Sequence, residues 1–296
     1  MRSRLRQLSR DLGEAGHAIS PPTVGRLLKE RDYSLKANVK KAAGKDHPDR
    51  TQQFRYLEEQ KCAFLQAGQP VISVDTKKKE LIGNFANAGP AWCREAEVVN
   101  VHDFRQDALG RAAPYGIYDL RYNRGSVYVG ASADTPRFAV DAIAAWWREE
   151  GQAAYPDATH LLVLADSGGS NGCQPRAWKV QIQEELADRL GLTVTVCHYP
   201  TGCSKWNPIE HRLFGFISLN WAGQPLRTFA RMLGLIRGTT TTTGLTVRAS
   251  LLPGEYPTGE KVSHAQMKRL HLVRHAVCPR WNYTLHPRSG AVTAPA

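Results

Sequence analysis

Apolar residues near the start of the chain recur at the spacing of α-helices. Leucines lie three or four residues apart between residues 3 and 15, and Gly16 ends that run, which predicts a first helix. Ser20 suits an N-cap and Pro21 suits the first helical position, so a second helix is expected to begin there. The apolar face of this second helix would consist of Val24, Leu27 and Leu28. The pattern therefore predicts two short helices joined by a glycine-containing turn.

After a further helix at about residues 51–67, the pattern changes from helices to strands. Short apolar or alternating runs predict strands at 70–76, 79–85, 116–120, 126–130, 161–165, 193–197 and 245–249. Helical spacing predicts helices at 136–150, at 175–190, from Pro208 onward with Asn207 as its cap, and at 263–270. We expect the first two strands to form a hairpin with Asp75 near its turn, and the next two to form a second hairpin. Strands followed by alternating helices and strands predict an α/β fold with a mixed sheet flanked by helices.

The charge of the chain indicates a class of partner. Of 296 residues, 39 are Lys or Arg and 27 are Asp or Glu, which gives a formal charge of +12. A basic excess is typical of nucleic-acid-binding proteins, although membrane-surface and heparin-binding proteins share it. No apolar run approaches the roughly 18 residues that a bilayer requires, and the basic start lacks the apolar core of a secretory signal. We therefore expect a cytoplasmic protein with no membrane partner, associated with the nucleoid.

The amino-terminal segment is the most basic part of the chain. Residues 1–50 hold 12 basic and 6 acidic residues, half of the whole excess. The second predicted helix carries Arg26, Lys29 and Arg31, as the recognition helix of a helix-turn-helix unit would. A helical hairpin with a solvated basic face is the alternative. Because helix-turn-helix units commonly contain three helices, we expect that sequence upstream of Met1 is missing.

Three acidic residues lie at the ends of predicted core elements. Asp75 ends one apolar run, Asp166 ends another, and Glu210 lies two residues after Pro208 in a predicted first helical turn. Carboxylates that converge from strands and a helix suit hard divalent cations, and two such cations can align a phosphodiester displacement. Each acid also has an ordinary explanation: Asp75 in a solvated hairpin, Asp166 as a turn residue, and Glu210 as a partner of the helix dipole.

Other chemistry finds less support in the sequence. The six cysteines are scattered with no CxxC pair, as expected of reduced thiols. Cys197, His198, Cys203 and His211 could be imagined as a zinc site, but their spacing fits no standard ligand pattern. The glycine-rich segment after Asp166 fits no phosphate-binding loop, so nucleotide binding is not expected.

Three segments resemble a known family. Residues 71–80, 165–172 and 204–214 resemble the motifs of DDE-type insertion-sequence transposases, in particular the Rhodopirellula-type group. The resemblance extends over residues 5–285, which is nearly the whole chain.

The resemblance implies an RNase H-like catalytic domain. Its carboxylate triad, which would bind metal and catalyse the reaction, corresponds to Asp75, Asp166 and Glu210. Mg²⁺ is the implied cofactor, with Mn²⁺ expected to substitute. The implied reaction is metal-dependent strand cleavage at the ends of the element, followed by transfer of the 3′-hydroxyl into target DNA. A nuclease of this fold that only cleaves and a non-enzymatic helix-turn-helix DNA-binding protein are the alternatives.

We also expect a division into three segments and a DNA partner. Residues 1–50 would form a helix-turn-helix segment and linker, residues 51–240 the catalytic domain, and residues 241–296 an extension with a disordered tail. The expected partner is DNA, both the element's terminal repeats and the target, bound by a homo-oligomer. Candidate DNA contacts beyond the first segment, with surface charge or core packing as the alternative, are Lys77, Lys78, Lys205, Trp206 and Arg212.

Overall fold

The computed structural model describes residues 5–33, 48–91, 93–102 and 105–288. The chain divides into two compact units, Met1–Asp46 and His47–Ala296. Most of the predicted linker, up to residue 47, lies outside the described residues, and so does the predicted disordered tail from residue 289 onward.

The first unit contains the two predicted helices, α1 (Leu5–Glu14) and α2 (Pro21–Glu30). The side chain of Ser20 accepts a hydrogen bond from the backbone N–H of Thr23 at 3.4 Å, which is the N-cap interaction expected of this residue. Val24 is buried between the helices. Both helices and the start of the second are therefore confirmed.

In the described part of the second unit, nine strands form one sheet in the order β7-β4-β3-β1-β5-β6-β9-β8, with β2 beside β3. The strands are β1 (Val71–Thr76), β2 (Glu80–Ile82), β3 (Gly110–Asp119), β4 (Arg124–Gly130), β5 (His160–Ala165), β6 (Thr193–His198), β7 (Thr246–Leu251), β8 (Leu272–Arg274) and β9 (Asn282–Leu285).

The directions of the central strands define the fold. β1 pairs with β3 in an antiparallel manner, and β3 pairs with β4 in the same way. On its other edge β1 pairs with β5 in parallel, and β5 pairs with β6 in parallel. Three antiparallel strands followed by two parallel ones confirm the predicted α/β, RNase H-like mixed sheet. β1 lies inside the sheet, and helices pack on both of its faces, so its apolar residues Val71, Ile72 and Val74 are fully buried.

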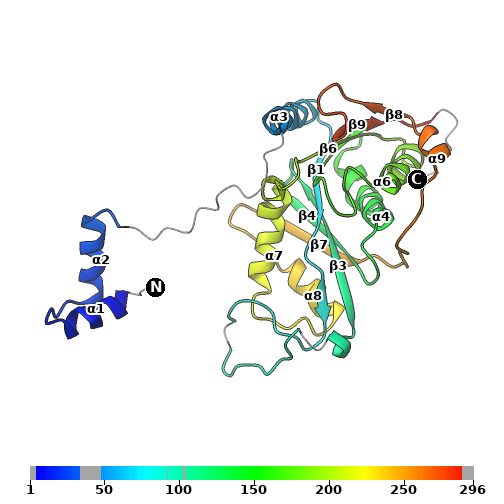
Figure 1. Cartoon of the computed structure of the whole chain (residues 1–296). Coiled ribbons are helices and arrows are strands. Elements are labelled where there is room, and N and C mark those ends of the chain that lie inside the picture. Colours follow the sequence, from blue (N-terminus) through cyan, green and yellow to red (C-terminus); the bar gives the residue numbers. More distant parts are fainter. Residues whose placement is uncertain (1–4, 34–47, 92, 103–104, 289–296) are drawn as a thin grey trace. The chain divides into compact units, whose positions relative to one another are not determined.

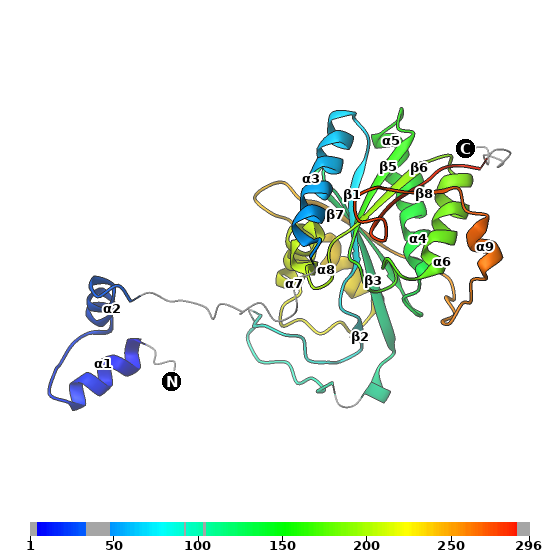
Figure 2. The ribbon, with the colours of Figure 1, turned by 45° about the horizontal axis from the view of Figure 1, so that its top comes forward.

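Helices cover both faces of this sheet. Figures 1 and 2 show α4 and α6 on one side of it and α7 and α8 on the other. On the first side Phe138, Ile143 and Trp178 belong to the larger core, and on the second Leu213 and Met232 belong to a separate core. No helix among the described residues is both long and apolar enough to span a membrane. The α-helices of this unit are α3 (Arg50–Gln66), α4 (Pro136–Trp146), α5 (Gln152–Ala154), α6 (Arg176–Gln181), α7 (Gly215–Asn220), α8 (Phe229–Arg237) and α9 (His264–Lys268).

Short segments of other helix types complete the set. Two 3₁₀ turns are η1 (Arg105–Asp107) and η4 (Ser204–Trp206). Three π-helical segments extend α-helices, and they are η2 (Trp147–Gly151), η3 (Ile182–Asp188) and η5 (Glu210–Phe214).

The hairpin predicted from residues 70–76 and 79–85 is wrong. Thr76 on β1 lies opposite Tyr115 on β3, and Glu80 on β2 lies opposite Ala112 further along the same strand. The chain therefore does not turn back at Lys77–Lys79, because β1 and β2 are successive segments along the ten-residue strand β3. Asp75 consequently lies in the middle of the sheet rather than beside a hairpin turn.

The carboxyl-terminal residues contribute more structure than the sequence predicted. The segment from residue 241 onward supplies β7, which pairs with β4, and β9, which pairs with β6. The predicted strand at 245–249 corresponds to β7, whereas α8, β8 and β9 were not predicted. Three or four residues are too few for a periodic pattern, so β8 and β9 leave little trace in the sequence.

Candidate active site

Two of the three candidate carboxylates lie at the same end of neighbouring parallel strands. Val74 on β1 is paired with Ala165 on β5, so the residues that follow them, Asp75 and Asp166, are neighbours. The carboxyl ends of parallel strands form the usual binding edge of an α/β sheet.

The electrostatics of this edge reflect the crowding of its acids. Burial, and next the charge of Asp166, raise the pKa of Asp75 to about 8. Burial also raises the pKa of Asp166 to about 6, while a hydrogen bond from Asn207 opposes that shift. Glu210 raises the pKa of both aspartates, so its carboxylate faces the same space. Full ionisation of these acids is therefore unfavourable unless a cation lies among them.

Glu210 enters the site from a helix whose apolar residues face the sheet. Pro208 is the first helical residue, as predicted, and Glu210 begins the π-helical segment η5. Ile209, Leu213 and Ile217 are buried in the core beneath it. π-Helical turns often occur at functional sites, since the extra residue redirects the side chains around it.

Asn207 directly precedes the first helical residue, as predicted, and its backbone oxygen accepts a 3.1 Å hydrogen bond from the N–H of Glu210, but its side chain does not cap the helix. Its amide nitrogen donates hydrogen bonds of 3.2 Å to the backbone oxygen of Val74 and to Oδ1 of Asp166. The capping oxygen comes instead from β1, where Ser73 Oγ accepts a hydrogen bond from the N–H of Ile209 at 3.0 Å. The fully buried Asn207 thus connects β1, Asp166 and the Glu210 helix.

Glycines on β3 and β4 let the Glu210 helix lie directly on the sheet. Gly116 is the β3 partner of Asp75, and a methyl group there would overlap Phe214 and come within 2.8 Å of Ile209 Cδ1. A methyl group at Gly125 would overlap Leu213 in the same way. These glycines therefore set the distance between Glu210 and the two aspartates.

The donor set fits a hard divalent cation, since all three candidate side chains offer carboxylate oxygens. Among the residues that the structure describes, no three His, Cys, Asp or Glu side chains are close enough to form a ready metal site. Repulsion between Asp75, Asp166 and Glu210 opposes a tighter cluster, and a bound cation would reverse the sign of that interaction.

Asp134 is a carboxylate of this site that sequence reasoning missed. Its Oδ1 accepts a hydrogen bond of 3.1 Å from Thr76 Oγ1, and its Oδ2 lies 3.7 Å from Lys79 Nζ. It is also among the charges that raise the pKa of Asp75. The sequence did not reveal this role, because Thr135 is the N-cap of α4 and an acidic residue just before a helix is explained by the helix dipole.

The other candidate residues differ in their surroundings. Lys77 is partly buried, with its Nζ 4.7 Å from the ring centre of Trp221, whereas Lys78 and Arg212 are exposed. Trp206 is 52% exposed, so packing in the core is excluded for it, and Lys205 Nζ lies 5.1 Å from the centre of its ring. In the first unit Arg26, Lys29 and Arg31 are exposed, and Arg26 forms a 2.5 Å ion pair with Glu30.

A cleft of about 740 Å³ opens beside Asp166. The glycine-rich segment after this residue forms one wall, and Pro200, Thr201 and Ser204 form the other. Gly169 adopts a positive φ of 75°, which a residue with a side chain rarely adopts. Asp166 itself lines the cleft, so a chain-like substrate that occupied it would lie against this carboxylate.

Comparisons with known proteins agree with the motifs. A family model described as "Rhodopirellula transposase DDE domain" matches residues 2–287. No curated protein matches the chain. Similar solved structures include "Mos1 transposase paired-end complex with left transposon end", with a TM-score of 0.45, and "Crystal structure of the Mos1 mariner paired end complex with Mn", with a TM-score of 0.44. Each is 13% identical over 77% of this chain, and the chain spans 64% of the Mos1 chains.

Proposed function

The chain belongs to the family described as Rhodopirellula transposase DDE domain, and from that premise we propose that it is a DNA transposase. It cleaves strands at the ends of an insertion sequence and joins the resulting 3′-hydroxyl to target DNA. The observation that carries this proposal is the juxtaposition of Asp75 and Asp166 on parallel strands, with Glu210 close enough to raise the pKa of both.

The three carboxylates act as the catalytic metal ligands. Asp75 and Asp166 supply oxygens from the rigid sheet, and Glu210 supplies oxygens from the helix above it. When held by these carboxylates, Mg²⁺ or Mn²⁺ would supply charge neutralisation at the scissile phosphate and alignment of the attacking oxygen. No covalent protein nucleophile is required, because orientation and charge account for the chemistry of phosphoryl transfer.

The remaining parts of the chain serve DNA recognition. Residues 1–50 recognise the terminal repeats, with Arg26, Lys29 and Arg31 as contacts from an exposed helix face. Near the carboxylates, the contacts come from Lys77, Lys78, Lys205, Trp206 and Arg212. The protein acts as a homo-oligomer on DNA in the cytoplasm, at the nucleoid, and its excess positive charge favours binding to the DNA backbone.

A strand-joining assay tests this function. The full chain is incubated with a duplex of the inverted repeat that flanks its gene, already cleaved at the 3′ end, and with a second labelled duplex. Joined product is expected with Mg²⁺ or Mn²⁺, and none with EDTA or with the Asp166→Asn variant. Cleavage of an uncut repeat without any joining would favour the nuclease. Metal-independent binding with neither reaction would favour the non-enzymatic DNA-binding protein.

A further inference from the structure

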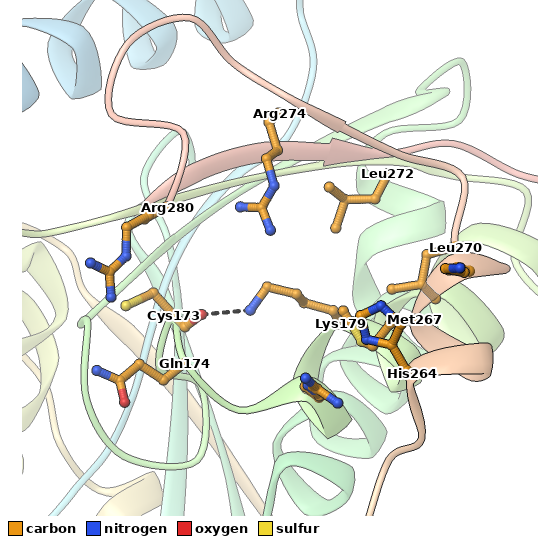
Figure 3. Close-up of a pocket in the computed structure, with 11 residues that line it drawn as sticks. Cys173, Gln174, Lys179, His264, Met267, Leu270, Leu272, Arg274 and Arg280 are labelled. Carbon is orange, nitrogen blue, oxygen red and sulfur yellow. Dashed lines mark hydrogen bonds between the residues drawn. The ribbon is translucent and has the colours of Figure 1, made fainter.

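Besides the cleft at Asp166, here called the carboxylate cleft, the chain has a second pocket of about 670 Å³. Figure 3 shows this second pocket. Its walls come from the segment after Asp166, from α6, from α9 and from the β8–β9 hairpin. Its volume is in the range of sites that bind small molecules, roughly 300–1,000 Å³. None of the described residues that line it is acidic, and its cationic side chains are Arg176, Lys179, Lys268, Arg274 and Arg280.

Lys179 gives this pocket a buried positive charge. The residue is only 5% exposed, and its Nζ donates a 2.5 Å hydrogen bond to the backbone oxygen of Cys173. Figure 3 shows the guanidinium of Arg274 directed toward it from β8. Burial lowers the pKa of Lys179 to about 8, with a smaller contribution from Arg274. Two cations that face one another without an acid between them form a site for an anion.

One end of the pocket is more apolar. Met267, Leu270 and Leu272 line it there, at the end away from Arg280 (Figure 3). Inorganic phosphate would leave this end uncovered, and the phosphates of an intact duplex carry bases that remain stacked inside the helix. A nucleotide whose base is unpaired presents both a phosphate and an apolar ring, so it matches both ends of the pocket.

The pocket adjoins the carboxylate cleft. Gln174 lines both spaces, and the residues between it and Asp166 form the wall of the cleft. A DNA strand whose scissile phosphate lies at Asp166 can therefore continue past Gln174 into the pocket.

We propose that this pocket binds an unpaired nucleotide of the DNA strand that occupies the cleft, an inference that rests on the proposed function. The phosphate lies between Lys179, Arg274 and Arg280, and the base lies on Met267 and Leu272. The pocket therefore keeps the DNA next to the cleavage site in an open, single-stranded form.

Fluorescence anisotropy of the full chain in EDTA tests this proposal without requiring any catalysis. Two labelled duplexes of one sequence are compared, one blunt and one with a three-nucleotide single-stranded extension. The pocket variant carries Arg274→Gln and Arg280→Gln, both at exposed side chains. The control variant carries Lys61→Gln on α3 and Arg248→Gln on β7, at the opposite edge of the sheet from β8. Both variants lose the same charge, and thermal unfolding is checked for each.

The pocket variant should bind the extended duplex about tenfold more weakly, with a salt slope about 1.4 units shallower, because two cations no longer contact a single strand. The affinity of the pocket variant for the blunt duplex should fall by less than about twofold. The affinity of the control variant for either duplex should also fall by less than about twofold. Equal losses for the two duplexes, or losses no greater than with the control variant, would overturn the proposal. Displacement of the extended duplex by micromolar deoxynucleoside monophosphate would instead assign the pocket to free nucleotides.

The outcome is separable from that of the proposed function. Selective binding of the extended duplex, together with a failed joining assay, would leave the pocket assigned and the transposase reaction refuted. Joining that proceeds normally in the pocket variant, with unchanged binding of the extended duplex, would leave the reaction intact and refute the pocket.

Discussion

The hydroxyl of Ser73 donates a 2.5 Å hydrogen bond to Oδ1 of Asn207, which joins the strand of Asp75 to the start of the Glu210 helix. The same hydroxyl accepts a hydrogen bond from Ile209, and the amide of Asn207 reaches Asp166. Two buried side chains, neither of them charged, therefore connect the backbone elements of all three carboxylates.

The first prediction concerns this connection. Ser73→Ala should lower the free energy of unfolding by about 1–3 kcal/mol, because it leaves the Ile209 N–H and the Asn207 oxygen without a partner. Strand joining should fall by about tenfold or more as Glu210 loses its fixed position. Ser218→Ala is the matched control, since its hydroxyl only bonds Phe214 within the same helix. Equal, small effects of both changes would show that Ser73 does not position the site.

The second prediction concerns Gly116. An alanine there should push the Glu210 helix away from β3 and cost about 1–3 kcal/mol of stability, because Phe214 and Ile209 already occupy the space. Activity should fall more than stability explains, since the displaced helix carries Glu210, the proposed metal ligand. Gly234→Ala on α8 has no atom within 4 Å of its new methyl group and should stabilise the protein by about 0.5–1 kcal/mol. Calorimetry and strand joining measure both variants, and full activity of Gly116→Ala would contradict the role of the close approach.

The third prediction concerns pH. Because burial and Asp166 raise the pKa of Asp75 to about 8, the folded protein holds a proton that the unfolded chain releases near pH 4. In EDTA, the free energy of unfolding should therefore fall as pH rises from about 4 to about 8. Asp75→Asn should flatten this fall and stabilise the protein at pH 8. Urea denaturation across this pH range measures the effect, and a parallel decline in wild type and variant would contradict it.

The fourth prediction concerns Glu210→Gln. The amide keeps the length of the side chain but is a poorer ligand for a hard cation, so the rate of cleavage should fall by about a thousandfold or more. DNA affinity should stay the same or rise, since one negative charge near the phosphate is lost. Adding Asp166→Asn should cost little more if, as proposed, both residues serve one metal site. Near-normal cleavage with glutamine at this position would remove Glu210 from the ligand set.

The fifth prediction concerns the division of labour along the chain. A fragment that begins at residue 47 keeps Asp49, which precedes α3, and the whole second unit. Its unfolding temperature and its binding of Mn²⁺ should match those of the full chain, while its affinity for DNA should fall. Titration with the same duplex compares the two proteins at equal salt. Undiminished affinity would mean that the first unit does not anchor the DNA.

The sequence predicted where helices begin better than it predicted which distant residues contact one another. Helix starts at Pro21 and Pro208 could be predicted because capping and proline geometry depend on neighbouring residues. The side-chain partner of Asn207 could not, because the atoms it bonds lie on a strand about 130 residues earlier in the chain. The predicted hairpin of residues 70–76 and 79–85 was wrong for a similar reason. A short polar connection between two strands resembles a turn in sequence, and the strand that β2 actually pairs with, β3, lies about 30 residues later.

The candidate site shows the same division. Asp75, Asp166 and Glu210 could be singled out because each directly follows or begins an apolar element. Asp134 could not, because its relation to the site depends on hydrogen bonding to Thr76 rather than on its own neighbours in the chain. The basic pocket was equally hidden, since its cations come from segments far apart in sequence.

The pairing of β9 with β6 also determines when the protein can first act during its own synthesis. Gln53 on α3 donates hydrogen bonds to the backbone oxygen of His198 on β6 and to Oδ1 of Asn282 on β9. Both strands therefore contact α3, the first helix of the second unit. A ribosome translates all three carboxylates before it reaches β9, and until then β6 has an open edge. An enzyme of the proposed function is therefore completed only late in translation, and a polypeptide released early would be a poor DNA-cutting enzyme.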